Sequence, residues 1–249
     1  MNKMTKYNIP MLFILCTWIS AQRVVGYYPQ WIQNSFPPEQ IDFSVITHVI
    51  HAFAWPNADG SISYYDNMLD PDIANVVHQN DRKLLLSFGG WGNTGGFAAM
   101  ASTIDSRENF ISNLLDLMFN YGYDGIDLDW EYPATAEETN DLTSLVDELR
   151  IAFDSINPDY MITMAVGPGN WSGQHFEYET MNENLDWFSM MGYDFHGSWS
   201  NHAGHNAPLY QSPPGDLDGA VHTGINYLLN SRNIPAEKLN LGVPFYGKK

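Results

Sequence analysis

The sequence predicts an α/β fold, a (β/α)8 TIM barrel that is incomplete, with strands one to seven present. Short apolar runs alternate with longer amphipathic segments, the order expected of βαβ units with right-handed crossovers. The apolar runs are hydrophobic on both faces, as in a parallel sheet covered by helices. A length of 249 residues without a low-complexity linker fits one barrel domain.

The predicted strands are rich in β-branched and aromatic residues and are bounded by Gly, Pro or polar residues. The seven runs are 23–28, 45–55, 83–88, 125–130, 160–166, 187–191 and 239–245.

Three of the intervening segments have the hydrophobic spacing of an amphipathic helix. In segment 107–120, Phe110 and Leu114 fall on one face, and segments 137–153 and 216–229 repeat the pattern. We therefore expect helices that cover the strands on the outside of the barrel.

The N-terminus has the order of a secretory signal peptide. Lysines precede the short apolar run 11–19, and the small residues Ser20 and Ala21 follow it. The run is shorter than the roughly 20 residues that span a bilayer. We predict a signal peptide over 1–21 and a secreted, extracellular domain over 22–249, with no membrane attachment after cleavage.

The charge and hydrophobic content of the chain exclude some classes of binding partner. The chain carries 29 acidic and 11 basic residues, a formal net charge of −18. Such a surface argues against nucleic acid, which needs clustered Lys and Arg. Disorder is excluded because 44% of the residues are hydrophobic and only 16% are charged. We expect a monomer that binds a neutral substrate.

Three acidic residues alternate along the fourth predicted strand. Asp127, Asp129 and Glu131 are two residues apart and therefore share one face of a strand, while Trp130 and its apolar neighbours face the core. Lys and Arg are absent from residues 122–149, so no local ion pair offsets the cost of burying these charges. A solvated acidic edge strand is the alternative, and the apolar flanks disfavour it.

Carboxylates this close cannot all ionise at neutral pH, so at least one proton stays in the group. Glu131 lies closest to the C-terminal end of the strand, where barrel active sites sit. It is our candidate general acid, kept protonated by the carboxylates beneath it.

The acidic spacing DxxDxDxE begins at Asp124 and ends at Glu131. Further segments accompany it in order between residues 24 and 249: 87–91 (SFGGW), 191–197 (MGYDFHG), 204–210 (GHNAPLY) and 241–247 (LGVPFYG). Together they resemble glycoside hydrolase family 18, the chitinase family.

The resemblance implies an endo-acting chitinase that cleaves β-1,4 bonds between N-acetylglucosamine units with retention, assisted by the substrate and without a cofactor. Glu131 would protonate the glycosidic oxygen, and the 2-acetamido oxygen would attack C1 to give an oxazolinium ion. Asp129 would accept a hydrogen bond from the acetamido N–H, and Asp127 would exchange a proton or hydrogen bond with Asp129. Tyr193 would donate to the acetamido oxygen, and Asp194 would hold the distorted sugar.

Chitin or a chito-oligosaccharide is the expected ligand, and its apolar C–H faces pack on aromatic rings. The resemblance implies further substrate-binding positions at Tyr27, Trp31, Phe53, Gly89, Gly90, Trp91, Tyr132 and Met191, with Asp124 and Ser87 as structural motif residues. Tyr193 and Asp194 are adjacent, so both reach the site only if their strand ends or bulges there.

The resemblance also implies an eighth strand, which supplies a Trp beneath the cleaved sugar, and an α+β insertion after the seventh strand. The sequence ends at Lys249 with neither. We therefore expect a C-terminally truncated catalytic domain from a longer protein, and the motifs do not predict whether this chain is active by itself.

Two other functions stay open. The chain could hydrolyse another N-acetylglucosamine glycan, such as peptidoglycan or the core of an N-glycan, because the acetamido requirement is the same. It could also be a non-catalytic chitin-binding lectin, although such relatives typically lose the acid and Glu131 is present.

The histidines His196, His202 and His205 lie within ten residues of one another. Their spacing matches no common zinc motif, so we interpret them as hydrogen-bonding residues of a loop and predict no metal. Asn170 lies in an acceptor sequence for N-glycosylation.

Overall fold

The computed structural model describes residues 22–247. The predicted signal peptide, 1–21, lies outside the described residues. Seven parallel strands form one curved sheet in chain order, and β3 adds an antiparallel pair to β2. The strands are β1 (Val25–Pro29), β2 (His48–Pro56), β3 (Ile62–Ser63), β4 (Lys83–Gly89), β5 (Gly125–Asp129), β6 (Met161–Val166), β7 (Trp187–Met190) and β8 (Leu239–Leu241).

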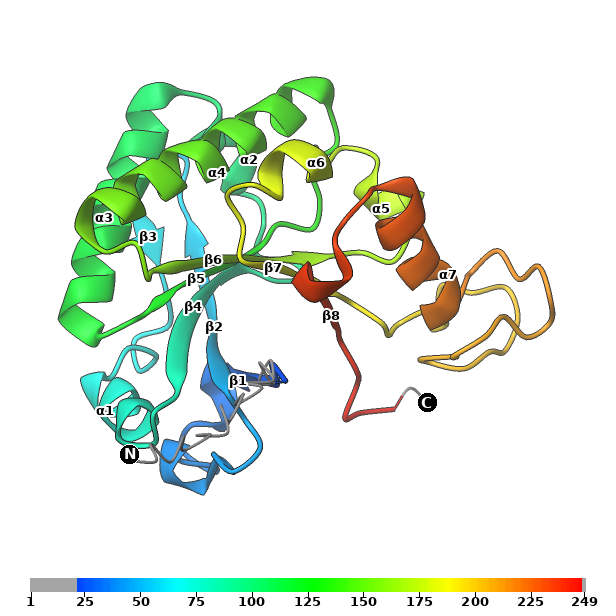
Figure 1. The fold of residues 1–249 in the computed structure, drawn as a ribbon, viewed down its shortest axis with the longest axis horizontal. Helices are drawn as coiled ribbons and strands as arrows, with labels where there is room; N and C mark the ends of the chain where they lie inside the picture. The colour runs from blue at the N-terminus through cyan, green and yellow to red at the C-terminus, as the bar shows by residue number, and fades with distance from the viewer. Residues whose placement is uncertain (1–21, 248–249) are drawn as a thin grey trace, which may run out of the picture.

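Helices connect these strands and cover the outside of the sheet, with α3, α4 and α6 together on one side of the strands (Figure 1). The helices are α1 (Pro71–Gln79), α2 (Phe97–Ala101), α3 (Ile104–Tyr121), α4 (Ala136–Ile156), α5 (Asn170–Gly173), α6 (Tyr178–Met181) and α7 (Val221–Asn226), which continues into a π-helical turn (Tyr227–Ser231). The fold is an incomplete (β/α)8 barrel, and the predicted fold class is confirmed.

Most predicted elements are present with ends that differ by a few residues. The seventh strand is shorter than predicted, since β8 ends at Leu241. The helix predicted over 216–229 begins only at Val221, because Asp216 and Asp218 are held in the preceding loop by contacts with His196. Helix α1 had no counterpart in the sequence interpretation.

The long helices begin and end where the local sequence dictates. Thr103 and Thr135 accept hydrogen bonds from the first turns of α3 and α4, respectively. Helix α3 ends at Gly122, whose φ of 74° is left-handed and favours glycine. Arg107 of α3 and Glu148 of α4 then join the two helices through two hydrogen bonds of 2.7 and 2.8 Å.

The main core lies between the sheet and the helices. Phe88 of β4 meets Phe110 of α3 edge to face, with ring centroids 5.2 Å apart. Trp130 stacks on Phe97 and is 4% exposed, as its position on the outward face of the fourth strand predicted. The carboxylates on the other parity therefore face the barrel interior.

A smaller cluster of Ile50, Leu85 and Trp187 fills the interior at the N-terminal end of the strands. The guanidinium of Arg23 lies 4.5 Å from the Trp187 ring and donates to the side chain of Asn240 on β8 at 2.9 Å. Arg23 precedes β1, so this side chain links the segment before the first strand to the last strand of the sheet.

None of the helices within residues 22–247 combines the length and the apolar character needed to cross a bilayer.

Two aliphatic residues of α4 allow the packing to be tested. Leu149 is fully buried and Ile151 is 70% exposed. Leu149→Ala should lower the free energy of unfolding by about 2–5 kcal/mol, because it leaves a cavity against the sheet. Ile151→Ala should change it by about 0.5 kcal/mol or less. Urea denaturation measures both, and equal losses would contradict this packing.

Candidate active site

The parallel register brings three side chains to one level of the barrel interior. Asp127 of β5 pairs with Ser87 of β4 on one side and with Thr163 of β6 on the other. Oδ2 of Asp127 accepts from the Ser87 hydroxyl at 2.9 Å and from the Tyr27 hydroxyl at 2.8 Å. Oδ1 accepts from the Thr163 hydroxyl at 2.6 Å.

Asp127 has no exposed surface, so its charge is costly. Burial raises the pKa of Asp127, and the hydrogen bonds from Thr163, Tyr27 and Ser87 partly oppose that rise. The three hydroxyls are neutral donors, so they stabilise a carboxylate without adding a counter-charge.

Asp129 ends β5 and is 5% exposed. Its pKa is raised well above the ordinary value, first by burial and then by the charges of Glu131 and Asp127. Among the described residues, none donates a hydrogen bond to Oδ1 of Asp129, although this atom is buried. A buried acceptor without a donor is rare in folded proteins, so Oδ1 of Asp129 is available to accept a hydrogen bond from a bound ligand or water.

Two glycines allow the backbone around Asp129 to pack closely. The N–H of Gly90 donates to the carbonyl oxygen of Asp129 at 3.0 Å. Gly89 has a φ of 110°, and a Cβ on it would lie 2.2 Å from that same oxygen. Segment 87–91 therefore shapes the backbone at the end of β5, and no side chain at position 89 fits there.

Glu131 follows the end of β5 and is half-buried. The Tyr132 hydroxyl donates to its Oε2 at 3.0 Å. Burial is the main cause that raises the pKa of Glu131, the charge of Asp194 adds to the rise, and the Tyr132 hydrogen bond opposes it. The sequence interpretation attributed this proton affinity to the carboxylates beneath Glu131, whereas the largest cause is burial and the neighbouring charge comes from the loop after β7.

Tyr193 and Asp194 follow β7, which ends at Met190. Burial raises the pKa of Tyr193, and the charge of Asp129 is the next cause, so the phenol belongs to the environment of the carboxylates. Asp194 has a φ of 60° and accepts from the Tyr246 hydroxyl at 2.9 Å. The strand ends before the two residues, which is the condition under which both were expected to reach the site.

The predicted aromatic positions are largely on the surface. Trp31 is 66% exposed and Trp91 is 80% exposed, which excludes them from the core. Phe53 lies between Tyr27 and Trp31, with ring centroids at 6.4 and 6.5 Å. These three rings form one contiguous set beside the carboxylates.

The other predicted positions lie around the same end of the barrel. Tyr132 is half-buried and meets Trp171 edge to face. Met191 is half-buried and donates its N–H to the carbonyl of Val166 at the end of β6. The ring of Phe53 lies about 3.1 Å from where a Cβ on Gly90 would be.

Asp124 lies apart from the three carboxylates. It accepts from the Leu84 N–H and from the Lys83 ammonium, each at 2.9 Å, and contacts His78 at 2.8 Å. These contacts join the starts of β4 and β5, so Asp124 positions the strand that carries the acids.

The sequence interpretation missed two residues of the site. Thr163 is the one polar residue in the described strand β6, and a lone hydroxyl in an apolar strand was the available signal. Its pairing with Asp127 depends on strand register. Tyr246 lies in a segment that carried the family resemblance, yet its bond to Asp194 joins positions 52 residues apart and leaves no local pattern.

Comparison with known proteins matches residues 23–249 to the family described as Glycosyl hydrolases family 18. The chain is 32% identical over 260 residues to Chitinase 1 of Aphanocladium album, which covers 89% of this chain and 60% of that protein. The fold of this chain is similar to that of catalytic domain 2 of the Group II chitinase of Ostrinia furnacalis, with a TM-score of 0.82 and 30% identity. The match covers 90% of this chain and 64% of that chain.

A mutant class V chitinase from Nicotiana tobaccum, solved in complex with NAG4, gives a TM-score of 0.79 at 28% identity, with coverage of 89% of this chain and 66% of that chain. The chain thus spans 60% of Chitinase 1 and about two thirds of the solved chains.

The raised pKa of Asp129 predicts how stability depends on pH. The folded state holds this proton above the ordinary pKa of 3.8, so the free energy of unfolding should fall as pH rises from about that value through the raised pKa. Asp129→Asn should make this decline shallower, by about 1.4 kcal/mol for each tenfold difference in proton affinity.

Urea denaturation at mildly acidic and neutral pH measures the effect. The exposed carboxylate of Asp159 supplies a matched control, since Asp159→Asn should leave the pH dependence unchanged. An identical decline in wild type and Asp129→Asn would contradict the assigned burial of this charge.

Proposed function

Because this chain belongs to glycosyl hydrolase family 18, we propose that it hydrolyses internal β-1,4 bonds between N-acetylglucosamine units of chitin, with retention at the anomeric carbon. One observation carries the proposal. Oδ1 of Asp129 is buried and has no hydrogen-bond donor among the described residues. Asp129 lies between Asp127, whose two carboxylate oxygens both accept hydrogen bonds, and Glu131, which is half-exposed.

Glu131 is the general acid in the first step. Its raised pKa keeps a proton available, and its partial exposure lets that proton reach a bound glycosidic oxygen. The Tyr132 hydroxyl at 3.0 Å fixes the carboxyl group and stabilises the anion that forms when the proton leaves. The C1–O bond breaks as the oxygen takes the proton.

The nucleophile is the carbonyl oxygen of the substrate's own 2-acetamido group, which bonds to C1 and gives an oxazolinium ion. The acetamido N–H donates to Oδ1 of Asp129, which thereby gains its missing donor and stabilises the positive charge. Asp127 shares a proton with Asp129, and the Tyr193 phenol donates to the acetamido oxygen.

Water completes the reaction. Glu131, now a carboxylate, removes a proton from water as the water oxygen attacks C1. The bond between C1 and the acetamido oxygen breaks at the same time. Two displacements at C1 from opposite faces retain its configuration. Asp194, held by the Tyr246 hydroxyl, binds the distorted sugar between the two steps.

The surface rings bind the flanking sugars. Trp31 and Phe53 stack beside Tyr27, and Trp91 is 80% exposed, so they offer apolar faces to successive sugar rings. The class V chitinase of similar fold was solved with NAG4, which supports an N-acetylglucosamine oligosaccharide as the ligand here. The proposal includes secretion after removal of residues 1–21 and action as a monomer.

The acid can be tested by an isosteric change. Glu131→Gln should lower hydrolysis of a chromogenic chito-oligosaccharide by about 10²–10⁴-fold, because the amide cannot donate the required proton. Binding of chitotetraose, measured by calorimetry, should stay within a few-fold of wild type. Glu137→Gln, at an exposed carboxylate of α4, is the matched control and should keep full activity.

Unchanged turnover in Glu131→Gln would remove the assignment of the acid. Binding without hydrolysis in wild type would instead identify a lectin.

Substrate assistance can be tested by removing the acetamido group. Wild type should cleave chito-oligosaccharides and leave the matching glucosamine oligomers intact, because these lack the carbonyl oxygen that attacks C1. Chromatography of the products measures both reactions. Equal rates on the two substrates would contradict the oxazolinium mechanism, and proton NMR of the first product would test retention independently.

A further inference from the structure

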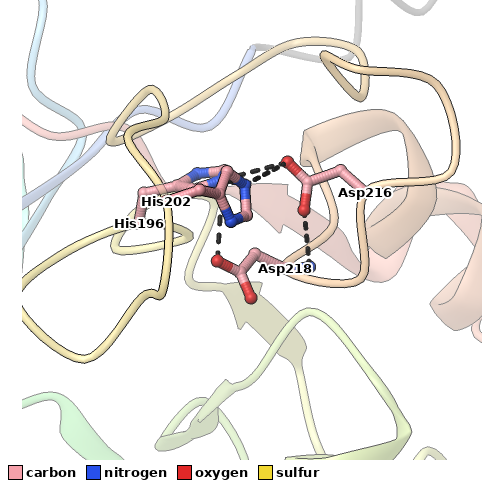
Figure 2. Close-up of side chains that lie close together, drawn as sticks. All are labelled: His196, His202, Asp216 and Asp218. Atoms are coloured by element: carbon pink, nitrogen blue, oxygen red, sulfur yellow. Dashed lines mark hydrogen bonds and ion pairs between the residues drawn. The ribbon is translucent and has the colours of Figure 1, made fainter.

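A second group of chemically active side chains lies in the loop between β7 and α7, apart from the carboxylates of β5. We call it the His-Asp cluster, and it consists of His196, His202, Asp216 and Asp218 (Figure 2). The histidines come from the first half of the loop and the aspartates from its second half. One ligand atom from each residue lies within 4.8 Å of all the others.

The outer nitrogen of each imidazole faces an acceptor. Nδ1 of His196 lies 2.9 Å from the carbonyl oxygen of His205, and Nδ1 of His202 lies 2.8 Å from Oδ1 of Asn201. Oxygens of this kind only accept hydrogen bonds, so each Nδ1 carries the proton. In the neutral rings, both Nε2 atoms therefore present lone pairs to the centre of the cluster.

Three hydrogen-bond acceptors therefore meet at the centre of the cluster. The two Nε2 atoms are 3.3 Å apart, and they lie 3.0 and 3.2 Å from Oδ2 of Asp216. Two lone pairs and a carboxylate oxygen repel one another at these distances, and a cation among them would remove that repulsion. Histidines that bind metals usually donate their outer N–H to a carbonyl or carboxylate, as both rings do here with oxygen acceptors.

Four contact distances between the ligand atoms, from 3.0 to 3.6 Å, are close to those around one small cation. A tetrahedral zinc ion with bonds of about 2.0–2.1 Å separates its ligand atoms by about 3.3–3.4 Å. Oδ2 of Asp218 lies 3.6 Å from Nε2 of His196 and is the candidate fourth ligand. Two imidazoles with two carboxylates suit zinc and its first-row neighbours, whereas calcium and magnesium prefer oxygen alone.

The His-Asp cluster is buried on one side and borders a cavity on the other. The side chains of His196 and Asp216 are 5% and 1% exposed, and a Cβ on Gly204 would lie 2.0 Å from the His196 ring. His202, Asp216 and Asp218 also line a cavity of about 400 Å³. The cluster thus has a closed side and an open side by which an ion enters.

We propose that the His-Asp cluster binds one Zn²⁺ ion through His196, His202, Asp216 and Asp218. The ion joins the two halves of the loop between β7 and α7 and fixes the backbone two residues after Asp194. The sequence interpretation treated the histidines as hydrogen-bonding residues, because Asp216 follows His202 by 14 positions in no recognised spacing. The side chain of His205 lies outside the cluster, and only its carbonyl oxygen contributes.

Zinc titration of the metal-free full chain tests the proposal, with a chromophoric chelator as competitor. Wild type should bind one equivalent, and His202→Gln should bind at least about tenfold more weakly, because it loses a ligand. His205→Gln changes a histidine of the same loop outside the cluster and should bind as wild type does. Cobalt in place of zinc should give the visible absorption of a tetrahedral ion in wild type and His205→Gln only.

Thermal unfolding supplies a second readout. Zinc should raise the Tm of wild type and of His205→Gln but not that of His202→Gln, since a ligand of the folded state alone stabilises it. With chelator, all three should unfold alike, and Asp218→Asn repeats the test if His202→Gln fails to fold. Absence of stoichiometric binding in wild type, or equal binding in His202→Gln and wild type, would overturn the proposal and leave hydrogen bonds with Asp216 as the role of the two histidines.

Discussion

The site depends on the cost of burying three carboxyl groups in one short row without a cation. Among the described residues, no Lys, Arg or His side chain forms an ion pair with Asp127, Asp129 or Glu131. Their neighbours are neutral hydroxyls and other acids, so burial raises the pKa of all three. In the proposed reaction, a member of the row that holds its proton donates it, and a member that is ionised stabilises the positive charge.

The barrel provides this environment through strand register. Because parallel strands place residues at equal heights, Ser87 and Thr163 reach Asp127 from its two neighbouring strands. Both carboxylate oxygens of Asp127 accept hydrogen bonds from hydroxyls. Asp129 is therefore the first carboxylate in the row with an oxygen that lacks a donor among the described residues. The β7–α7 loop then adds Tyr193 and Asp194, and if the His-Asp cluster binds zinc, a single ion fixes the loop that holds them.

Much of the fold could be predicted from the sequence, because hydrophobic periodicity and the Gly and Pro boundaries of strands are local signals. Seven strands, α3 and α4 were found within a few residues of their observed ends, and the inward parity of the acids followed from a spacing of two. Helix α7 was placed too early, since the contacts of Asp216 with His196 hold its first predicted turn in a loop.

The sequence by itself determined the fold class, the row of acids and the side of the strand on which they lie. Only the tertiary structure decided the donors to Asp127, the orphaned oxygen of Asp129, the Tyr246 contact with Asp194 and the meeting of His202 with Asp216. Alternation along a strand is set by neighbouring peptide units, so a short sequence carries it. A hydrogen bond or a ligand set between distant positions depends on register and loop path, which the packing of the whole chain fixes.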